Sequence, residues 1–166
     1  MNLISVLLNE SHKKQSFRCG KTPLDYYIQK LAKQDIKRSL AACYVIEDNN
    51  TIAGYYTLSS NSIPYTECPI DLVKKLPKGY TDLPTILLGR LAVDSKYQGN
   101  GLGKILSVDA LKRCVESSKS VAAFAIIVNP IDAQAQAFYE SYGFILIPGA
   151  NKMFLPIATT EKYCYD

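Results

Sequence analysis

Residues 85–104 read TILLGRLAVDSKYQGNGLGK, an apolar run followed by three closely spaced glycines. The run predicts a strand over residues 85–93, and the residues after Gly103 predict a helix that ends near Ser117. A glycine-rich turn between a strand and a helix exposes backbone N–H groups at the positive end of the helix dipole, which suits a pyrophosphate. Taken alone, the short glycine pattern is better explained by a plain tight turn, and no Gly-Lys-Ser/Thr sequence makes it a P-loop.

The remaining chain predicts a mixed α/β protein. Apolar runs indicate strands over residues 3–8, 42–46, 52–58, 121–128, 144–147 and 152–157. Helices are expected from Thr22 and over residues 132–142. Residues 60–84 hold four of the eight prolines, so we interpret them as a long excursion with at most one short helix, over residues 70–76. Strand–helix–strand–helix order with an antiparallel tail is typical of mixed α/β folds. No linker or repeat interrupts residues 1–166, which predicts a single domain.

Composition excludes several classes of protein. The apolar fraction of 48% and the charged fraction of 20% are those of a globular chain. No apolar run approaches the ~18 residues of a membrane helix, so we expect a soluble, cytoplasmic protein without membrane contact. The five cysteines form no CxxC pair, and His12, expected on the surface, is the one histidine. We therefore expect neither a disulfide scaffold nor a metal site.

Positive charge is concentrated near the N-terminus. Residues 11–40 carry eight basic and two acidic groups, a net +6 in a chain of net charge +4. Thr22 is a candidate N-cap with Pro23 in the first turn, and a buried stripe is expected at Leu24, Ile28, Leu31 and Ile36. The opposite face would present Tyr26, Lys30, Lys33 and Lys37. This face is equally compatible with a polyanion partner and with a solvated surface.

The second predicted helix carries a candidate acid. Small alanines at 133, 135 and 137 leave room for a ligand along the helix start, and Tyr139 offers a phenol near the end of a strand. Most such tyrosines are half-buried packing residues, which is the plain alternative. Tyr142 is a second, less favoured phenol because it falls next to Gly143, where the helix is expected to stop.

Two of these patterns together resemble the GNAT superfamily of N-acyltransferases: Gln98-x-x-Gly101-x-Gly103, and Ala135-x-x-x-Tyr139-x-x-x-Gly143-Phe144. The resemblance implies a GNAT fold, with one mixed sheet of about six or seven strands flanked by helices, and acetyl-CoA as acyl donor. It implies that Tyr139 is the general acid for the departing thiolate; thiols have a pKa of ~8.5 and phenols of ~10. It assigns acetyl-CoA binding to Leu91, Ala92 and Val93 (pantetheine arm), to Gln98, Gly99, Asn100, Gly101, Leu102, Gly103 and Lys104 (pyrophosphate), and to Asn129, Asp132, Ala135 and Phe138.

A narrower resemblance covers the N-terminal half. The stretches Phe17–Gly20, Leu24–Tyr27, Ala32–Asp35, Gly54–Leu58 and Leu88–Asp94 are similar to those of TacT/AtaT-type toxins of toxin–antitoxin modules. This implies acetylation of the α-amino group of aminoacyl-tRNA, which blocks translation, a homodimer, and a ribbon-helix-helix antitoxin. Nucleic-acid-binding candidates are then Tyr26, which could stack on a base, and the basic residues Lys30, Lys33, Lys37, Arg38 and Arg90, which could contact phosphates. The chain departs from the toxins at Asn129–Asp132, where they often carry an Asp-Ala pair.

Two other functions fit the same residues. One is N-acetylation of a small-molecule or peptide amine, for which Glu67 or Asp82 could supply a base. The other is an acyl-CoA-binding regulatory or co-repressor module. An α-amino group has a pKa near ~7.7–8.0 against ~10.4 for a lysine side chain, so an aminoacyl acceptor needs little base catalysis. The lack of an obvious base therefore favours the toxin.

Overall fold

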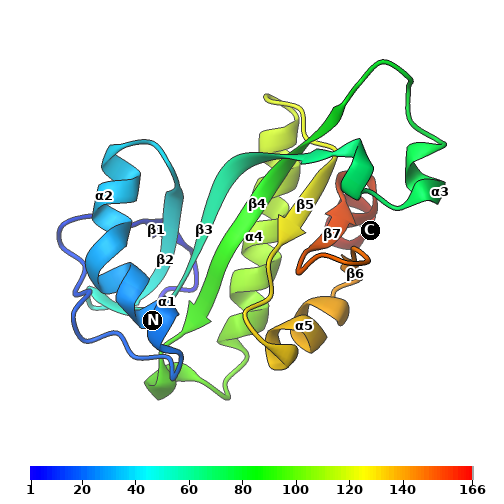
Figure 1. Ribbon diagram of the computed structural model, residues 1–166. Helices are drawn as coiled ribbons and strands as arrows, with labels where there is room; N and C mark the ends of the chain where they lie inside the picture. Colours follow the sequence, from blue (N-terminus) through cyan, green and yellow to red (C-terminus); the bar gives the residue numbers. More distant parts are fainter. Residues whose placement is uncertain (166) are drawn as a thin grey trace. The chain divides into compact units, whose positions relative to one another are not determined.

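A computed structural model describes residues 1–165. Seven strands form one mixed sheet in the order β1-β2-β3-β4-β5-β7-β6 (Figure 1). The strands are β1 (Val6–Leu7), β2 (Ala42–Asp48), β3 (Thr51–Pro64), β4 (Asp82–Val93), β5 (Ala125–Val128), β6 (Ile145–Leu146) and β7 (Met153–Pro156). The helices are α1 (Thr22–Tyr26), η1 (Tyr27–Leu31), α2 (Ala32–Lys37), η2 (Tyr65–Glu67), α3 (Ile70–Val73), η3 (Ser95–Tyr97), α4 (Leu102–Ser118), α5 (Ala133–Glu140) and α6 (Ile157–Tyr165). The predicted mixed α/β class is confirmed.

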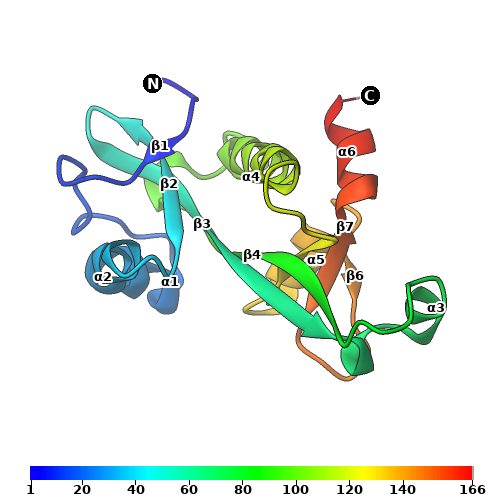
Figure 2. The same ribbon diagram turned by 90° about the horizontal axis from the view of Figure 1, so that it is seen from above.

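The chain divides into two compact units, which we describe separately. The first unit comprises residues 1–59 and 88–111, and the second comprises residues 60–87 and 112 onward. Within the first unit, α1, η1 and α2 follow one another on one side of β2, and the start of α4 lies on the other side of β3 (Figure 2). No helix within residues 1–165 is long and apolar enough to span a membrane.

The core of the first unit is rich in aromatic rings. Phe17 meets Tyr55 edge to face at 5.3 Å between ring centroids, and both are buried. The Tyr55 hydroxyl donates to the Leu24 carbonyl at 2.7 Å, so burial of the ring leaves no unpaired polar group. These contacts fix α1 on β3, the sheet neighbour of the strand that leads into the glycine-rich turn.

Gly54 in β3 lets α4 approach the sheet closely. A Cβ at this position would lie 2.5 Å from Leu106 Cδ1 and 3.1 Å from the Ala92 carbonyl oxygen. On the same helix, one Asp109 oxygen accepts from the Tyr56 and Ser5 hydroxyls, both at 2.5 Å. Helix α4 is therefore held to β3 by a close backbone approach and by hydrogen bonds.

We expect Gly54→Ala to destabilise the protein by about 1–3 kcal/mol, the usual cost of overpacking a core. The added methyl group must displace the end of the Leu106 side chain or shift α4 away from β3. The measurement is the urea midpoint at unchanged m-value. A midpoint equal to that of the wild type would mean that Leu106 rotates away freely.

The N-terminal helix differs from its prediction in two ways. It begins at Thr22 itself, with Lys21 as N-cap and no side-chain cap, so the prediction of Thr22 as the cap was wrong. Residues Tyr27–Leu31 form a π-helix, which takes more residues per turn than an α-helix. This shifts the buried stripe by one position: Leu31 is 37% exposed, and Ala32 is fully buried in its place.

In the second unit, the apolar strand β5 is shorter than predicted. It begins at Ala125 instead of Val121, because the Val121 N–H donates to the Ser117 carbonyl (2.9 Å) and keeps that stretch in a turn. All four β5 residues are buried, with β4 pairing in parallel on one side and β7 antiparallel on the other. Strand β3 reaches Pro64, so the start of the predicted excursion is strand. Helix α6 was not predicted.

His12 is buried, contrary to prediction. Its Nδ1 accepts a hydrogen bond from the Asn9 N–H at 3.0 Å, and its Nε2 lies 3.0 Å from Glu47 Oε2. The side chain therefore fastens the loop after β1 to the β2–β3 hairpin. Glu47 lies 35 positions after His12, so no local pattern in the sequence indicates this contact.

Candidate active site

The predicted glycine-rich segment forms the turn from β4 to α4. Gly99 and Gly101 have φ angles of +83° and +79°, in the left-handed region that glycine adopts without strain. Gly103 has no positive φ, and a Cβ there would meet only Val93 Cγ2, at 3.9 Å. The backbone therefore requires glycine at 99 and 101, whereas the absence of a side chain at 103 leaves open space beside the first turn of α4.

The backbone donors of this turn are free. None of the N–H groups from Gln98 to Lys104 donates a hydrogen bond to a residue that the structure describes. The first bonded amide in α4 is that of Ile105, which donates to the Gly101 carbonyl at 3.2 Å. Unpaired N–H groups at a helix N-terminus attract anions, because they add to the positive end of the dipole. The turn therefore fits a pyrophosphate, which it would bind by its backbone.

A layer of hydrogen bonds supports the turn from the N-terminal segment, and sequence reasoning missed it. The buried Asp94 carboxylate accepts from the backbone N–H groups of Arg18 and Lys96, both at 2.9 Å. The Gln98 amide donates to the carbonyls of Cys19 (2.9 Å) and Val93 (2.8 Å). The Gln98 side chain is thus engaged within the chain, and only its backbone N–H remains for a ligand. Both segments stood among the family-like stretches, but their contact spans 76 residues of sequence.

The end of β4 offers backbone groups of its own. The pairing of β4 with β5 extends only from Thr85 to Leu87. Leu91 and Val93 are half-buried and Ala92 is buried. Since the Val93 carbonyl accepts from Gln98, the groups left for an extended ligand are those of Leu91 and the Val93 N–H.

In the second unit, Tyr139 is a buried phenol with a free hydroxyl. Its ring packs edge to face against Phe138 and Phe144, each 5.4 Å away between centroids. The residue is 9% exposed, and its hydroxyl has no hydrogen-bond partner within residues 1–165. The hydroxyl oxygen is not fully enclosed by protein atoms, so it still reaches solvent. Burial raises the pKa of Tyr139, so it keeps its proton well above neutral pH.

The start and end of α5 fix this ring. The Asp132 carboxylate caps the helix by accepting from the Ala135 N–H at 2.8 Å. The helix ends at Glu140, short of the predicted residue 142, and Gly143, at φ +92° in the turn that follows, returns Phe144 against the ring. Asp132 and Phe138 therefore serve the helix and the ring packing, and Asn129 is exposed. Tyr142 is half-buried and contacts only Phe138 of these rings (5.2 Å), so its ring is held less firmly than that of Tyr139.

The candidate phosphate-binding residues differ in availability. Tyr26, Lys30, Lys37 and Arg38 are exposed, as predicted. Lys33 is exposed but lies 3.1 Å from Glu10 Oε1, which offsets part of its charge. Arg90 is half-buried, with its guanidinium 3.5 Å above the centre of the buried Tyr27 ring. The Arg90 guanidinium therefore makes a cation–π contact with that ring, which makes Arg90 a weaker candidate for contact with a phosphate.

A mixed sheet, a glycine-rich turn with free N–H groups after β4 and a phenol on the later helix α5 are the features expected of an acyl-CoA-dependent N-acyltransferase. The chain belongs to the acetyltransferase (GNAT) family, whose model matches residues 6–144. The predictions of family and enzyme class are thus confirmed, and the acyl donor is acetyl-CoA. The free N–H groups at residues 98–104 and the open space at Gly103 fit its pyrophosphate.

Known toxins of this family are similar to nearly the whole chain. It is 34% identical to the "tRNA-acetylating toxin" of Mycobacterium tuberculosis over 141 residues, 85% of this chain and 83% of that protein. The crystal structure of a KacT mutant with tyrosine replaced by phenylalanine superposes with a TM-score of 0.87, at 27% identity over 96% of this chain and 98% of that one. The structure of AtaT complexed with acetyl-methionyl-tRNAfMet gives 0.85, at 26% identity and the same coverage.

Proposed function

We propose that this acetyltransferase is a toxin that acetylates the α-amino group of aminoacyl-tRNA and thereby blocks translation. The observation that carries the proposal is the 34% identity to a tRNA-acetylating toxin over 85% of the chain. The AtaT complex with an acetylated aminoacyl-tRNA supports the same substrate class. Because a toxin must be restrained by its host, we further propose that a ribbon-helix-helix antitoxin neutralises it. We also propose that it is a cytoplasmic homodimer and that residues 1–166 act as one domain.

The side chains of this protein suit that reaction. Acetyl-CoA supplies the acetyl thioester. The free N–H groups from Gln98 to Lys104 would hold its pyrophosphate, and the backbone of Leu91–Val93 its pantetheine arm. The Tyr139 hydroxyl holds the proton that the departing thiolate requires, and its raised pKa keeps that proton in place at neutral pH. The acceptor α-amino group has an unperturbed pKa near ~7.7–8.0, which its ester neighbour lowers, against ~10.4 for a lysine side chain, so a far larger share of it is neutral at that pH and it needs little base catalysis.

The exposed cations of α1 to α2 are the proposed phosphate contacts. Lys30, Lys37 and Arg38 make no ion pair with a described residue, and Tyr26 is 54% exposed beside them. Each phosphate contact adds to the salt dependence of binding, by about one unit or slightly less in the logarithmic slope. The double substitution Lys30→Ala with Lys37→Ala would therefore flatten the slope by roughly one to two units.

The test is transfer of labelled acetyl groups from acetyl-CoA to a pool of charged tRNAs, with uncharged tRNA as control. Label on the aminoacyl group, and none on uncharged tRNA, is the expected result. Sequencing the labelled tRNAs then gives the specificity. A protein that binds acetyl-CoA but labels only small amines would overturn the substrate proposal, and one that consumes no acetyl-CoA with any amine would be a binding module.

A further inference from the structure

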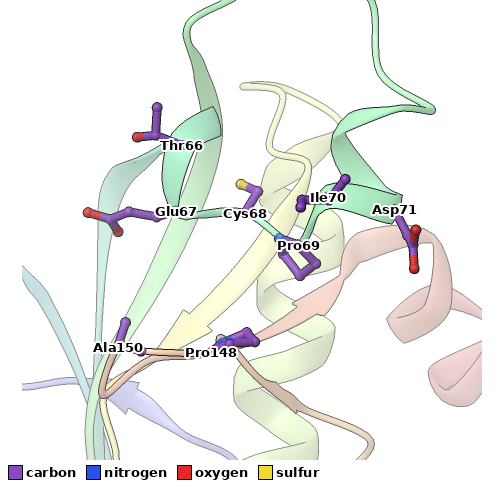
Figure 3. A pocket seen from close by; sticks show the side chains of 9 residues that line it. Thr66, Glu67, Cys68, Pro69, Ile70, Asp71, Pro148 and Ala150 are labelled. Atoms are coloured by element: carbon purple, nitrogen blue, oxygen red, sulfur yellow. The ribbon is translucent and has the colours of Figure 1, made fainter.

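A cavity opens within the second unit, in the excursion whose role the sequence leaves open. Its volume is about 690 Å³, within the range of small-molecule sites. One wall is the segment from Thr66 to Asp71, and the other is the turn Pro148–Ala150 (Figure 3). Pro69, Ile70 and Pro148 give it apolar surfaces, and Figure 3 shows the Glu67 and Asp71 carboxylates on opposite sides of Pro69.

Lysines follow the cavity directly in the chain. Residues 74–80, which we call the lysine loop, read KKLPKGY. Lys74, Lys75 and Lys78 are all exposed, and none forms an ion pair with a residue that the structure describes. Tyr80 is 65% exposed. Because the Lys74 N–H donates to the Ile70 carbonyl (3.0 Å), Lys74 stands one helical turn from the cavity wall.

The lysine loop is held in place at its base. The Tyr65 N–H donates to the Thr81 carbonyl at 2.9 Å, and the Tyr65 hydroxyl to the Pro77 carbonyl at 3.4 Å. Lys152, two residues after the turn Pro148–Ala150, lies 3.0 Å from Glu67 Oε2 and fixes that carboxylate. The cations and the cavity therefore form a defined surface on one scaffold.

The charge pattern of this surface selects its ligand. Carboxylates at the cavity and cations beyond its rim suit a molecule with hydrogen-bond donors at one end and phosphates at the other. An unpaired nucleotide has this chemistry: carboxylates accept from exocyclic amino groups, apolar and aromatic side chains stack on bases, and lysines contact phosphates. An acidic peptide would bring its charge against Asp71, whose carboxylate has no ion-pair partner within residues 1–165.

The cavity is also connected to the helix that carries Tyr139. The turn Pro148–Ala150 continues into Asn151, whose side-chain amide donates to the Pro130 carbonyl at 3.0 Å. Pro130 lies two residues before Asp132, which caps α5. A ligand in the cavity therefore contacts a turn that is bonded directly to the start of α5.

We propose that the cavity and the lysine loop bind the single-stranded 3′ end of tRNA. An unpaired base enters between Pro69 and Pro148, and Lys74, Lys75 and Lys78 contact the flanking phosphates. The inference rests on the proposed function, because it identifies how the acceptor's reactive end is held. It also assigns a role to residues 65–80 that is separate from the cations of α1 to α2.

The test compares two RNAs and three lysine variants in a binding assay that needs no acetyl transfer. The RNAs are intact uncharged tRNA and the same tRNA without its unpaired 3′ nucleotides. For Lys74→Ala with Lys75→Ala and Lys78→Ala, we expect affinity for the intact tRNA to fall about 10-fold or more. Its salt slope should fall by roughly two units, at about 0.7 per single-strand phosphate. The variant should bind the trimmed tRNA with the same affinity as the wild-type protein does.

Three controls make the result specific. Replacing the exposed Lys112, Lys119 and Lys162 with alanine changes the net charge equally and should change neither affinity. Lys30→Ala with Lys37→Ala should weaken binding of both RNAs alike. Ile70→Ser changes a side chain that is 72% exposed, and it should weaken the binding of intact tRNA without altering the salt slope of that binding.

Two outcomes would overturn the inference. One is an equal loss on intact and trimmed tRNA in the lysine-loop variant. The other is displacement of the tRNA end by polyglutamate but not by a short single-stranded RNA, which would assign the surface to an acidic protein. A wild type that binds the 3′ end but transfers no acetyl group would refute the proposed function while leaving the binding site intact.

Discussion

Tyr139→Phe is expected to lower kcat for acetyl transfer about 100-fold or more, while the affinity for acetyl-CoA stays nearly unchanged. The substitution removes one oxygen and keeps the ring, which packs between Phe138 and Phe144. Since the hydroxyl has no partner among residues 1–165, its loss leaves no unsatisfied group and should not destabilise the fold. Single-turnover kinetics with labelled acetyl-CoA measures the effect.

Tyr142→Phe is the matched control, because it removes the same atom from the neighbouring half-buried phenol. It should leave kcat within a few-fold of the wild type. The raised pKa of Tyr139 also means that its acid form persists past pH 10, so kcat should not fall between neutral pH and that value. A variant series in which Tyr142→Phe, and not Tyr139→Phe, abolishes turnover would reverse the assignment.

Gly103→Ala should have opposite effects on stability and on ligand binding. A Cβ there meets only Val93 at 3.9 Å, so replacing a helical glycine should stabilise the protein by about 0.5–1 kcal/mol. The same methyl group would project beside the free N–H groups that we assign to the pyrophosphate. Losing one hydrogen bond to a charged group, at about 1.5–3 kcal/mol, would weaken acetyl-CoA about 10- to 100-fold.

Calorimetric titration with acetyl-CoA and a urea melt measure the two effects on one sample. Ser117→Ala provides the control, because it raises helix propensity at the exposed far end of the same helix without touching the turn. It should leave acetyl-CoA affinity unchanged. If Gly103→Ala is more stable and binds acetyl-CoA as tightly as the wild type, the pyrophosphate does not occupy this helix start.

The segments that sequence predicted best are those whose signals are local. The strand, turn and helix from β4 to α4 lie within one continuous stretch, and the turn was placed correctly at the glycines. Helix α5 likewise has Asp132 as its N-cap and is followed closely by Gly143, which has a positive φ in the turn after the helix. Capping and backbone conformation depend on neighbours a few residues away, so the sequence carries them directly.

The features that were missed depend on distant partners. Arg90 was predicted to contact nucleic acid, but in the structure its guanidinium covers the ring of Tyr27, which lies 63 residues earlier in the chain. The π-helix at Tyr27–Leu31 was also missed, because the spacing of apolar residues in the sequence does not indicate where a helix takes more residues per turn. The Gln98 amide reads as a ligand-binding group in sequence, but its carbonyl partner is at Cys19. The position of such a residue in the sequence does not indicate which distant group its side chain contacts.

The bonds between residues 18–19 and 94–98 have a consequence for the newly made protein. They join positions 76 to 79 residues apart, so the support of the glycine-rich turn closes only after most of the first unit has left the ribosome. Long-range contacts of this kind form late in folding, and domains are synthesised from the N-terminus onward. An unfinished chain therefore holds the N-terminal segment without the turn that it supports, and the support of that turn is complete only once residue 98 has been made.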